Sequence, residues 1–104
     1  MPTKITFLFD NPADPDVFEE RFADGYLALV RALPGVERIE SARVWPKEDG
    51  SPTPAHRIVD AYFADYEAAC EAVKTPAAGA LFPATFELGT GGVKVLFSDV
   101  EEAG

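Results

Sequence analysis

The chain has 104 residues, of which 47% are hydrophobic and 26% charged, and eighteen acidic against nine basic residues give a formal net charge of −9 at pH 7. A chain of this length and composition can bury one hydrophobic core, which argues against disorder. The negative charge repels phosphate backbones and anionic lipid headgroups, which argues against nucleic acid and membrane surfaces as partners.

The only cysteine is Cys70 and the only histidine is His56. One cysteine cannot form an internal disulfide, which fits a reducing cytoplasm. An ordinary zinc site needs three or four Cys and His ligands, so none is expected. We also expect no signal peptide and no membrane span, because no stretch has the required apolar run. The sequence therefore predicts a cytoplasmic protein.

The N-terminal half predicts a strand, a helix and a second strand. Residues 4–9 alternate so that Ile5, Phe7 and Phe9 share one face. Asp14 is a helix N-cap with Pro15 at the first helical position, and Pro34 with Gly35 ends the helix. Gly25 lies inside this predicted helix, where it suggests close packing. The apolar stripe of the helix is Phe18, Phe22, Tyr26, Leu29 and Leu33. Residues 36–45 predict the next strand.

The C-terminal half repeats this order. After a polar loop at 46–55, residues 57–63 predict a strand with Val59, Ala61 and Phe63 on one face. Asp65 can cap a helix that the Thr75-Pro76 pair breaks, with one further short turn at 77–82. A glycine loop at 89–92 leads into a final strand at 93–100.

The order β-α-β-β-α-β predicts an α+β, ferredoxin-like fold: a four-stranded antiparallel sheet with both helices on one face. Two helices cover only one face, yet the strands carry apolar residues on both; Leu8 and Leu96, for example, alternate with Phe7 and Val95. We therefore infer a homodimer that packs sheet against sheet.

The sequence resembles the EthD family of the dimeric α/β-barrel superfamily over nearly its whole length. The matching segments are FDNPAD with Phe18 (9–18), LALVRALPGV (27–36), AYFADYEAACEAV (61–73), Thr75-Pro76 and TGGVKVLFSDV (90–100). The resemblance implies a single EthD-like ferredoxin-fold domain over residues 1–104 and a dimeric α/β barrel of eight strands. It also implies a ligand cleft between each sheet and its helices.

Tyr26 stands where many relatives carry a histidine, seven residues before the leucine of the LPG motif. A phenol stays protonated at neutral pH, so Tyr26 is not a ready general base. It is either a core tyrosine or a pocket residue that donates a hydrogen bond to a ligand. His56 is either an exposed loop histidine or a catalytic base; haem ligation, known in other dimeric α/β barrels, is not expected.

Several aromatic residues are candidates for substrate binding. Arg43 and Trp45 share a strand face, and Tyr62 joins them if the register allows. The alternative is a dimer-interface patch, where these residue types are enriched. Phe82 and Phe86 flank Pro83 in a predicted loop, as a lid over the cleft or as a separate hydrophobic cluster.

Two functional hypotheses follow. In the first, an EthD-like homodimer binds a small apolar or aromatic ligand and acts as a cofactor-independent oxidoreductase or monooxygenase, isomerase or decarboxylase. Tyr26 and His56 would be its catalytic residues, and desolvation would drive much of the chemistry. In the second, the protein is a non-catalytic accessory or ligand-sequestering dimer of a degradation pathway. Neither hypothesis requires a metal or a cofactor.

Overall fold

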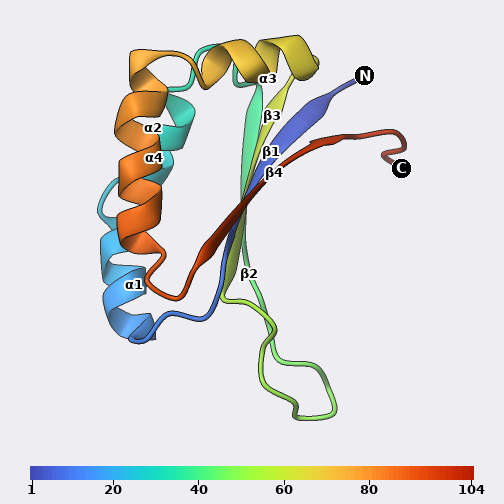
Figure 1. The fold of residues 1–104 in the computed structure, drawn as a ribbon. Coiled ribbons are helices and arrows are strands. Elements are labelled where there is room, and N and C mark those ends of the chain that lie inside the picture. Colours follow the sequence, from blue (N-terminus) through green and yellow to red (C-terminus); the bar gives the residue numbers. More distant parts are fainter.

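A computed structural model describes all of residues 1–104, and its four strands form one antiparallel sheet in the order β2-β3-β1-β4 (Figure 1). The strands are β1 (Thr3–Phe9), β2 (Arg38–Arg43), β3 (Arg57–Phe63) and β4 (Val93–Asp99). The two central strands, β1 and β3, pair with each other, while β2 and β4 form the edges. The predicted α+β, ferredoxin-like sheet is confirmed, and within one chain the sheet is open.

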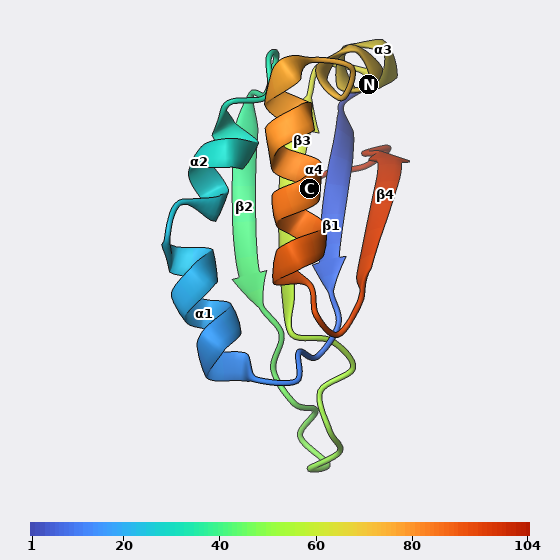
Figure 2. The same ribbon diagram turned by 60° about the vertical axis from the view of Figure 1, so that its left-hand side comes forward.

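The helices lie almost entirely on one face of this sheet. They are α1 (Pro15–Ala23), α2 (Tyr26–Arg31), α3 (Tyr66–Ala72) and α4 (Pro76–Leu88). Figures 1 and 2 show α1, α2 and α4 as a layer on one side and α3 across one end of the sheet. The opposite face carries no helix. No helix is long and apolar enough to cross a membrane.

The core fills the space between the helices and the sheet. Alternate residues of a strand point to the same face, and on β1 Ile5, Phe7 and Phe9 are fully buried against the helices. β3 contributes Val59, Ala61 and Phe63 in the same way. The helices add Phe18, Phe22, Tyr26, Val30, Leu81 and Leu88, and the turn after α2 adds Leu33. These side chains fill the middle of the space between helices and sheet, and a depression of about 290 Å³ remains at its edge, between Arg31 of α2 and Arg38 and Ile39 of β2.

The predicted helix over residues 14–33 is two helices. Its start is as expected, because the Asp14 carboxylate accepts hydrogen bonds from the N–H groups of Asp16 (3.1 Å) and Val17 (3.2 Å). Helix α1 ends at Ala23, and Gly25 adopts a φ of 95° before α2 begins. A Cβ at Gly25 would meet nothing within 4 Å. The glycine therefore serves the left-handed backbone rather than close packing.

The predicted short turn at 77–82 is part of the 13-residue helix α4, which continues through Pro83. Proline removes one helical hydrogen bond and costs about 3 kcal/mol in a helix interior. On α4 the residues Ala78, Leu81 and Leu88 recur at helical spacing and are buried in the core. Burial of each large side chain contributes roughly 2 kcal/mol, which offsets the cost of the proline.

The open face of the sheet is mixed rather than apolar throughout. Leu8 and Ile58 are paired neighbours and are half-buried, while Leu96 on β4 is 49% exposed. Beside them the Lys4 ammonium lies 3.7 Å from the Asp60 carboxylate. The expectation of an apolar face is therefore correct for one part of it only.

Candidate functional site

Tyr26 begins α2 and lies in the core with only 4% of its surface exposed. Its hydroxyl is 2.7 Å from the Oγ1 of Thr85 on α4. The Thr85 hydroxyl has one hydrogen and donates it to the Leu81 carbonyl (2.8 Å), so the Tyr26 O–H is the donor of the pair. Burial raises the pKa of Tyr26 to about 12. The phenol is therefore protonated at neutral pH, and its proton is already donated to the Thr85 hydroxyl.

A cleft of about 400 Å³ opens beside Tyr26, between the α1–α2 segment and α4. Its volume lies within the range of small-molecule sites. The hydrophobic lining residues are Tyr26, Leu29, Ala84 and Leu88, the charged ones are Arg21, Asp24 and Glu87, and Gly25 contributes backbone. The cleft thus lies between helices, in a place that the sequence did not predict.

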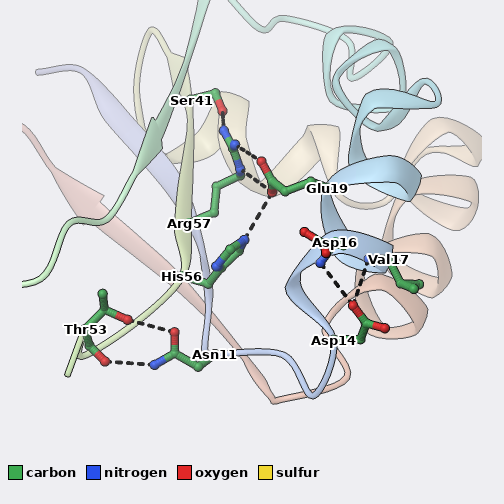
Figure 3. Close-up of polar contacts among 9 residues, drawn as sticks. All are labelled: Asn11, Asp14, Asp16, Val17, Glu19, Ser41, Thr53, His56 and Arg57. Carbon is green, nitrogen blue, oxygen red and sulfur yellow. Dashed lines mark hydrogen bonds and ion pairs between the residues drawn. The ribbon is translucent and has the colours of Figure 1, made fainter.

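His56 is 6% exposed, so the interpretation as an exposed loop histidine is wrong. Its N–H donates to the Phe9 carbonyl (2.8 Å) and its carbonyl accepts from the Val44 N–H (3.0 Å), which draws it into the sheet just before β3. The ring Nε2 lies 3.1 Å from the Glu19 carboxylate of α1 (Figure 3). The Phe18 ring packs edge-on against the imidazole at a centroid distance of 4.7 Å.

Glu19 also binds Arg57, the first residue of β3. The Arg57 Nε lies 3.3 Å from Glu19 Oε2, its Nη2 contacts Oε1, and its Nη1 donates to Ser41 Oγ at 3.0 Å (Figure 3). Burial alone would raise the pKa of Glu19, but the hydrogen bonds from Arg57 and His56 outweigh it and lower the pKa. The Glu19 carboxylate therefore links α1 to the sheet through its hydrogen bonds and ion pair with His56 and Arg57.

The structure does not bring His56 and Tyr26 to a common cavity. Tyr26 lines the cleft, whereas His56 lines none of the four surface depressions. No group of three or more His, Cys, Asp or Glu side chains is placed to hold a metal ion.

Of the predicted Arg43–Trp45–Tyr62 group, Arg43 and Trp45 lie together but Tyr62 does not join them. Strand β2 ends at Arg43, so Trp45 lies beyond it and is 75% exposed, with the Arg43 guanidinium 6.0 Å from its ring. Tyr62 lies on the open face instead, paired with Arg38, whose guanidinium is 4.3 Å from the Tyr62 ring. The Tyr62 hydroxyl donates to Glu40 at 2.7 Å.

Phe82 and Phe86 lie on α4 and not in a lid loop. Phe82 is half-buried against Phe7, with ring centroids 5.9 Å apart, and Phe86 is 59% exposed. Neither residue lines the cleft, to which α4 contributes Ala84, Glu87 and Leu88.

Sequence reasoning missed Thr85 and Glu19. Thr85 is the polar member of the buried stripe of α4, and reading residues 76–88 as a helix would have singled it out. Glu19 is 37 residues from His56, and no local pattern connects them.

No family model matches the chain. The uncharacterized 11.0 kDa protein of the thcB-thcC intergenic region of Rhodococcus erythropolis is 29% identical over 98 residues, which cover 94% of each chain. The crystal structure of an ethyl tert-butyl ether D (EthD) family protein from Bacillus halodurans superposes with a TM-score of 0.88 at 19% identity, covering 96% of this chain and 99% of that one.

Two further solved structures share the fold at lower scores. A dimeric ferredoxin-like protein of unknown function from Jannaschia sp. CCS1 has a TM-score of 0.67 at 17% identity, covering 96% of this chain and 100% of that one. SnoaB, a cofactor-independent oxygenase from Streptomyces nogalater, has a TM-score of 0.62 at 18% identity, covering 98% of this chain and 94% of that one. The predicted resemblance to the EthD family is thus confirmed at the level of the fold.

Proposed function

We propose that residues 1–104 form one EthD-like domain that binds a small apolar or aromatic molecule and works as a homodimer. The observation that carries the proposal is the cleft of about 400 Å³ beside Tyr26, whose walls Leu29, Ala84 and Leu88 are apolar. The names of similar proteins support it, since one is a dimeric ferredoxin-like protein and another a cofactor-independent oxygenase.

The open face of the sheet is the surface through which we propose that the homodimer forms. Two copies packed face to face would bury Leu8, Ile58 and Leu96 and complete a barrel of eight strands. The charged side chains of this face are already paired within the chain, Lys4 with Asp60, Arg38 with Glu40 and Lys94 with Asp10, so burying them leaves no charge unpaired.

Light scattering at low micromolar concentration tests the dimer. We expect twice the chain mass of 11.2 kDa. Ile58→Glu should give a monomer, because it places an unpaired charge in the packed face, whereas Glu101→Gln in the exposed C-terminal tail should not. A wild-type monomer under these conditions would refute the sheet-to-sheet packing.

The geometry favours binding without catalysis, as in an accessory or ligand-sequestering protein. A general base must reach the proton it removes within hydrogen-bonding distance, directly or through one water. The Tyr26 hydroxyl already donates to Thr85, and His56 borders no depression. Native mass spectrometry of the purified protein should therefore reveal a bound small molecule that is recovered unchanged. Filling the cleft with Ala84→Trp should abolish its capture.

The second candidate is a cofactor-independent oxygenase, isomerase or decarboxylase. It is supported by the fold shared with SnoaB and by the apolar side chains of Leu29, Ala84 and Leu88 in the lining of the cleft. In that case Tyr26 would exchange its bond to Thr85 for one to a ligand oxygen. Turnover of the captured molecule by the wild type, lost in a Tyr26→Phe protein that is still folded at the assay temperature, would establish it. Equal behaviour of the two proteins would remove Tyr26 from the mechanism.

A further inference from the structure

The rim of the cleft carries three charged side chains that have no partner. Arg21 lies in the last turn of α1, Asp24 is the residue that follows this helix, and Glu87 lies near the end of α4. None of the three side chains takes part in an ion pair with another residue. Glu19, by contrast, is held by both His56 and Arg57. The three side chains are exposed to solvent, so a ligand in the cleft can bind them in exchange for water without breaking an ion pair of the protein.

The floor and the rim of the cleft offer different kinds of group to a ligand, apolar side chains at the floor and charged ones at the rim. The phenol ring of Tyr26 and the side chains of Leu29, Ala84 and Leu88 offer an apolar surface that a ring or a compact hydrocarbon can cover. The guanidinium of Arg21 only donates hydrogen bonds, and the carboxylates of Asp24 and Glu87 only accept them. A hydroxyl group does both, so one hydroxyl can bind either kind of rim group.

The net charge of the rim limits the charge that a ligand can carry. One guanidinium and two carboxylates leave the cleft with a net charge of about −1, in a protein whose formal charge is −9. A phosphate ester or a dicarboxylate would gain one pairing with Arg21 but would face two carboxylates. Dianions are therefore disfavoured.

We infer that the ligand of this cleft is a hydroxylated aromatic or alicyclic compound that carries at most one negative charge. The inference rests on the proposed function and narrows its ligand class. Arg21 and Leu88 also border a second depression of about 200 Å³, lined in part by Val17 and Thr90. A ring substituent that passes Arg21 would enter this second depression.

Three related probes separate the effect of the hydroxyl group on affinity from those of the ring and of negative charge. They are 1-naphthol, naphthalene and 1-naphthyl phosphate. Binding is followed by NMR shifts of the Gly25 and Ala84 backbone amides. We expect 1-naphthol to bind about fivefold more tightly than naphthalene, as one net hydrogen bond predicts, and 1-naphthyl phosphate at least about tenfold more weakly than 1-naphthol.

Variants of the rim residues show which side chains cause the differences in affinity. Asp24→Asn/Glu87→Gln should improve binding of 1-naphthyl phosphate by about tenfold, since it removes the two repelling charges. Glu101→Gln/Glu102→Gln changes the net charge equally in the exposed tail and should leave all three affinities unchanged. Arg21→Gln should weaken binding of 1-naphthyl phosphate further.

The possible outcomes distinguish the two proposals. Failure of all three probes to shift the cleft amides would overturn the proposed function at this site. Equal binding of naphthalene and 1-naphthol would keep the cleft as a ligand site and overturn the hydroxylated class, as would tightest binding of 1-naphthyl phosphate. The same shifts in Ala84→Trp would place the binding outside the cleft and overturn both.

Discussion

The bond between Tyr26 and Thr85 predicts an unequal response to removing its two hydroxyls. Tyr26→Phe removes the donor, while the Thr85 hydroxyl keeps its own bond to the Leu81 carbonyl at 2.8 Å. Thr85→Val keeps the shape of the side chain but removes the acceptor. It leaves the Tyr26 O–H, on a side chain that is 4% exposed, without a partner.

The magnitudes follow from what each change leaves behind. Tyr26→Phe forfeits one net hydrogen bond, about 1 kcal/mol of unfolding free energy. Thr85→Val should cost about 2 kcal/mol, because a buried donor loses its partner without regaining water. The double variant removes both groups and should cost less than the sum of the two, with a coupling energy of about 1 kcal/mol. In a chain of this length the melting temperature should fall by about 5 °C per kcal/mol.

Urea titrations of the wild type, both single variants and the double variant, followed by circular dichroism, measure these differences. The slope with denaturant should stay constant, so that shifts in midpoint report stability alone. If Tyr26→Phe costs as much as Thr85→Val, or if the two costs simply add, Tyr26 is not the donor of an isolated buried pair and the reasoning fails.

Three further predictions concern pH and the backbone. Burial raises the pKa of Tyr26 from 10.0 to about 12, so ionising this phenol costs about 3 kcal/mol more in the folded protein than in the unfolded chain. The free energy of unfolding should therefore be unaffected below pH 10 and fall as the pH rises from 10 through 12. Tyr26→Phe should remove this alkaline loss in urea titrations above pH 9; an unchanged loss would contradict it. The pKa of Glu19 is lowered from 4.5, so its contribution is present above that pH and is lost as the pH falls through the lowered value. Thermal melts of Glu19→Gln should show a weaker dependence on acid, and a slope equal to that of the wild type would argue against the ion pair. Gly25→Ala should cost about 1 kcal/mol because of its φ of 95°, whereas Gly79→Ala inside α4 should stabilise by a similar amount, although both sites are open. Equal melting temperatures for the two variants would show that backbone angle is not the cause.

The sequence by itself determined the elements whose signals are local. The alternation of Ile5, Phe7 and Phe9 marks the buried face of β1, because side chains of a strand alternate whatever lies around it. Asp14 and Pro15 mark the start of α1, because a helix cap depends only on the next few residues. The order of such elements was enough to predict the ferredoxin-like sheet, and the matching segments along nearly the whole chain, taken together, were enough to find the EthD resemblance.

Tertiary structure decided whatever depends on residues far apart in the chain. Pro83 breaks a helix by local propensity, yet core packing of Leu81 and Leu88 carries α4 through it. His56 lies in a polar stretch that suggests exposure, and only the approach of α1 supplies Glu19 as its buried partner.

The cleft is a result of the same kind. It exists because the break at Gly25 and the passage of α4 leave space beside Tyr26, and no sequence pattern joins Tyr26 and Leu29 to Ala84 and Leu88 on the opposite wall. Composition and length described an acidic chain with one core, and periodicity described its layers. The packing of those layers decided which charged residues remain unpaired at the cleft, because hydrogen bonds and ion pairs form between neighbours in space.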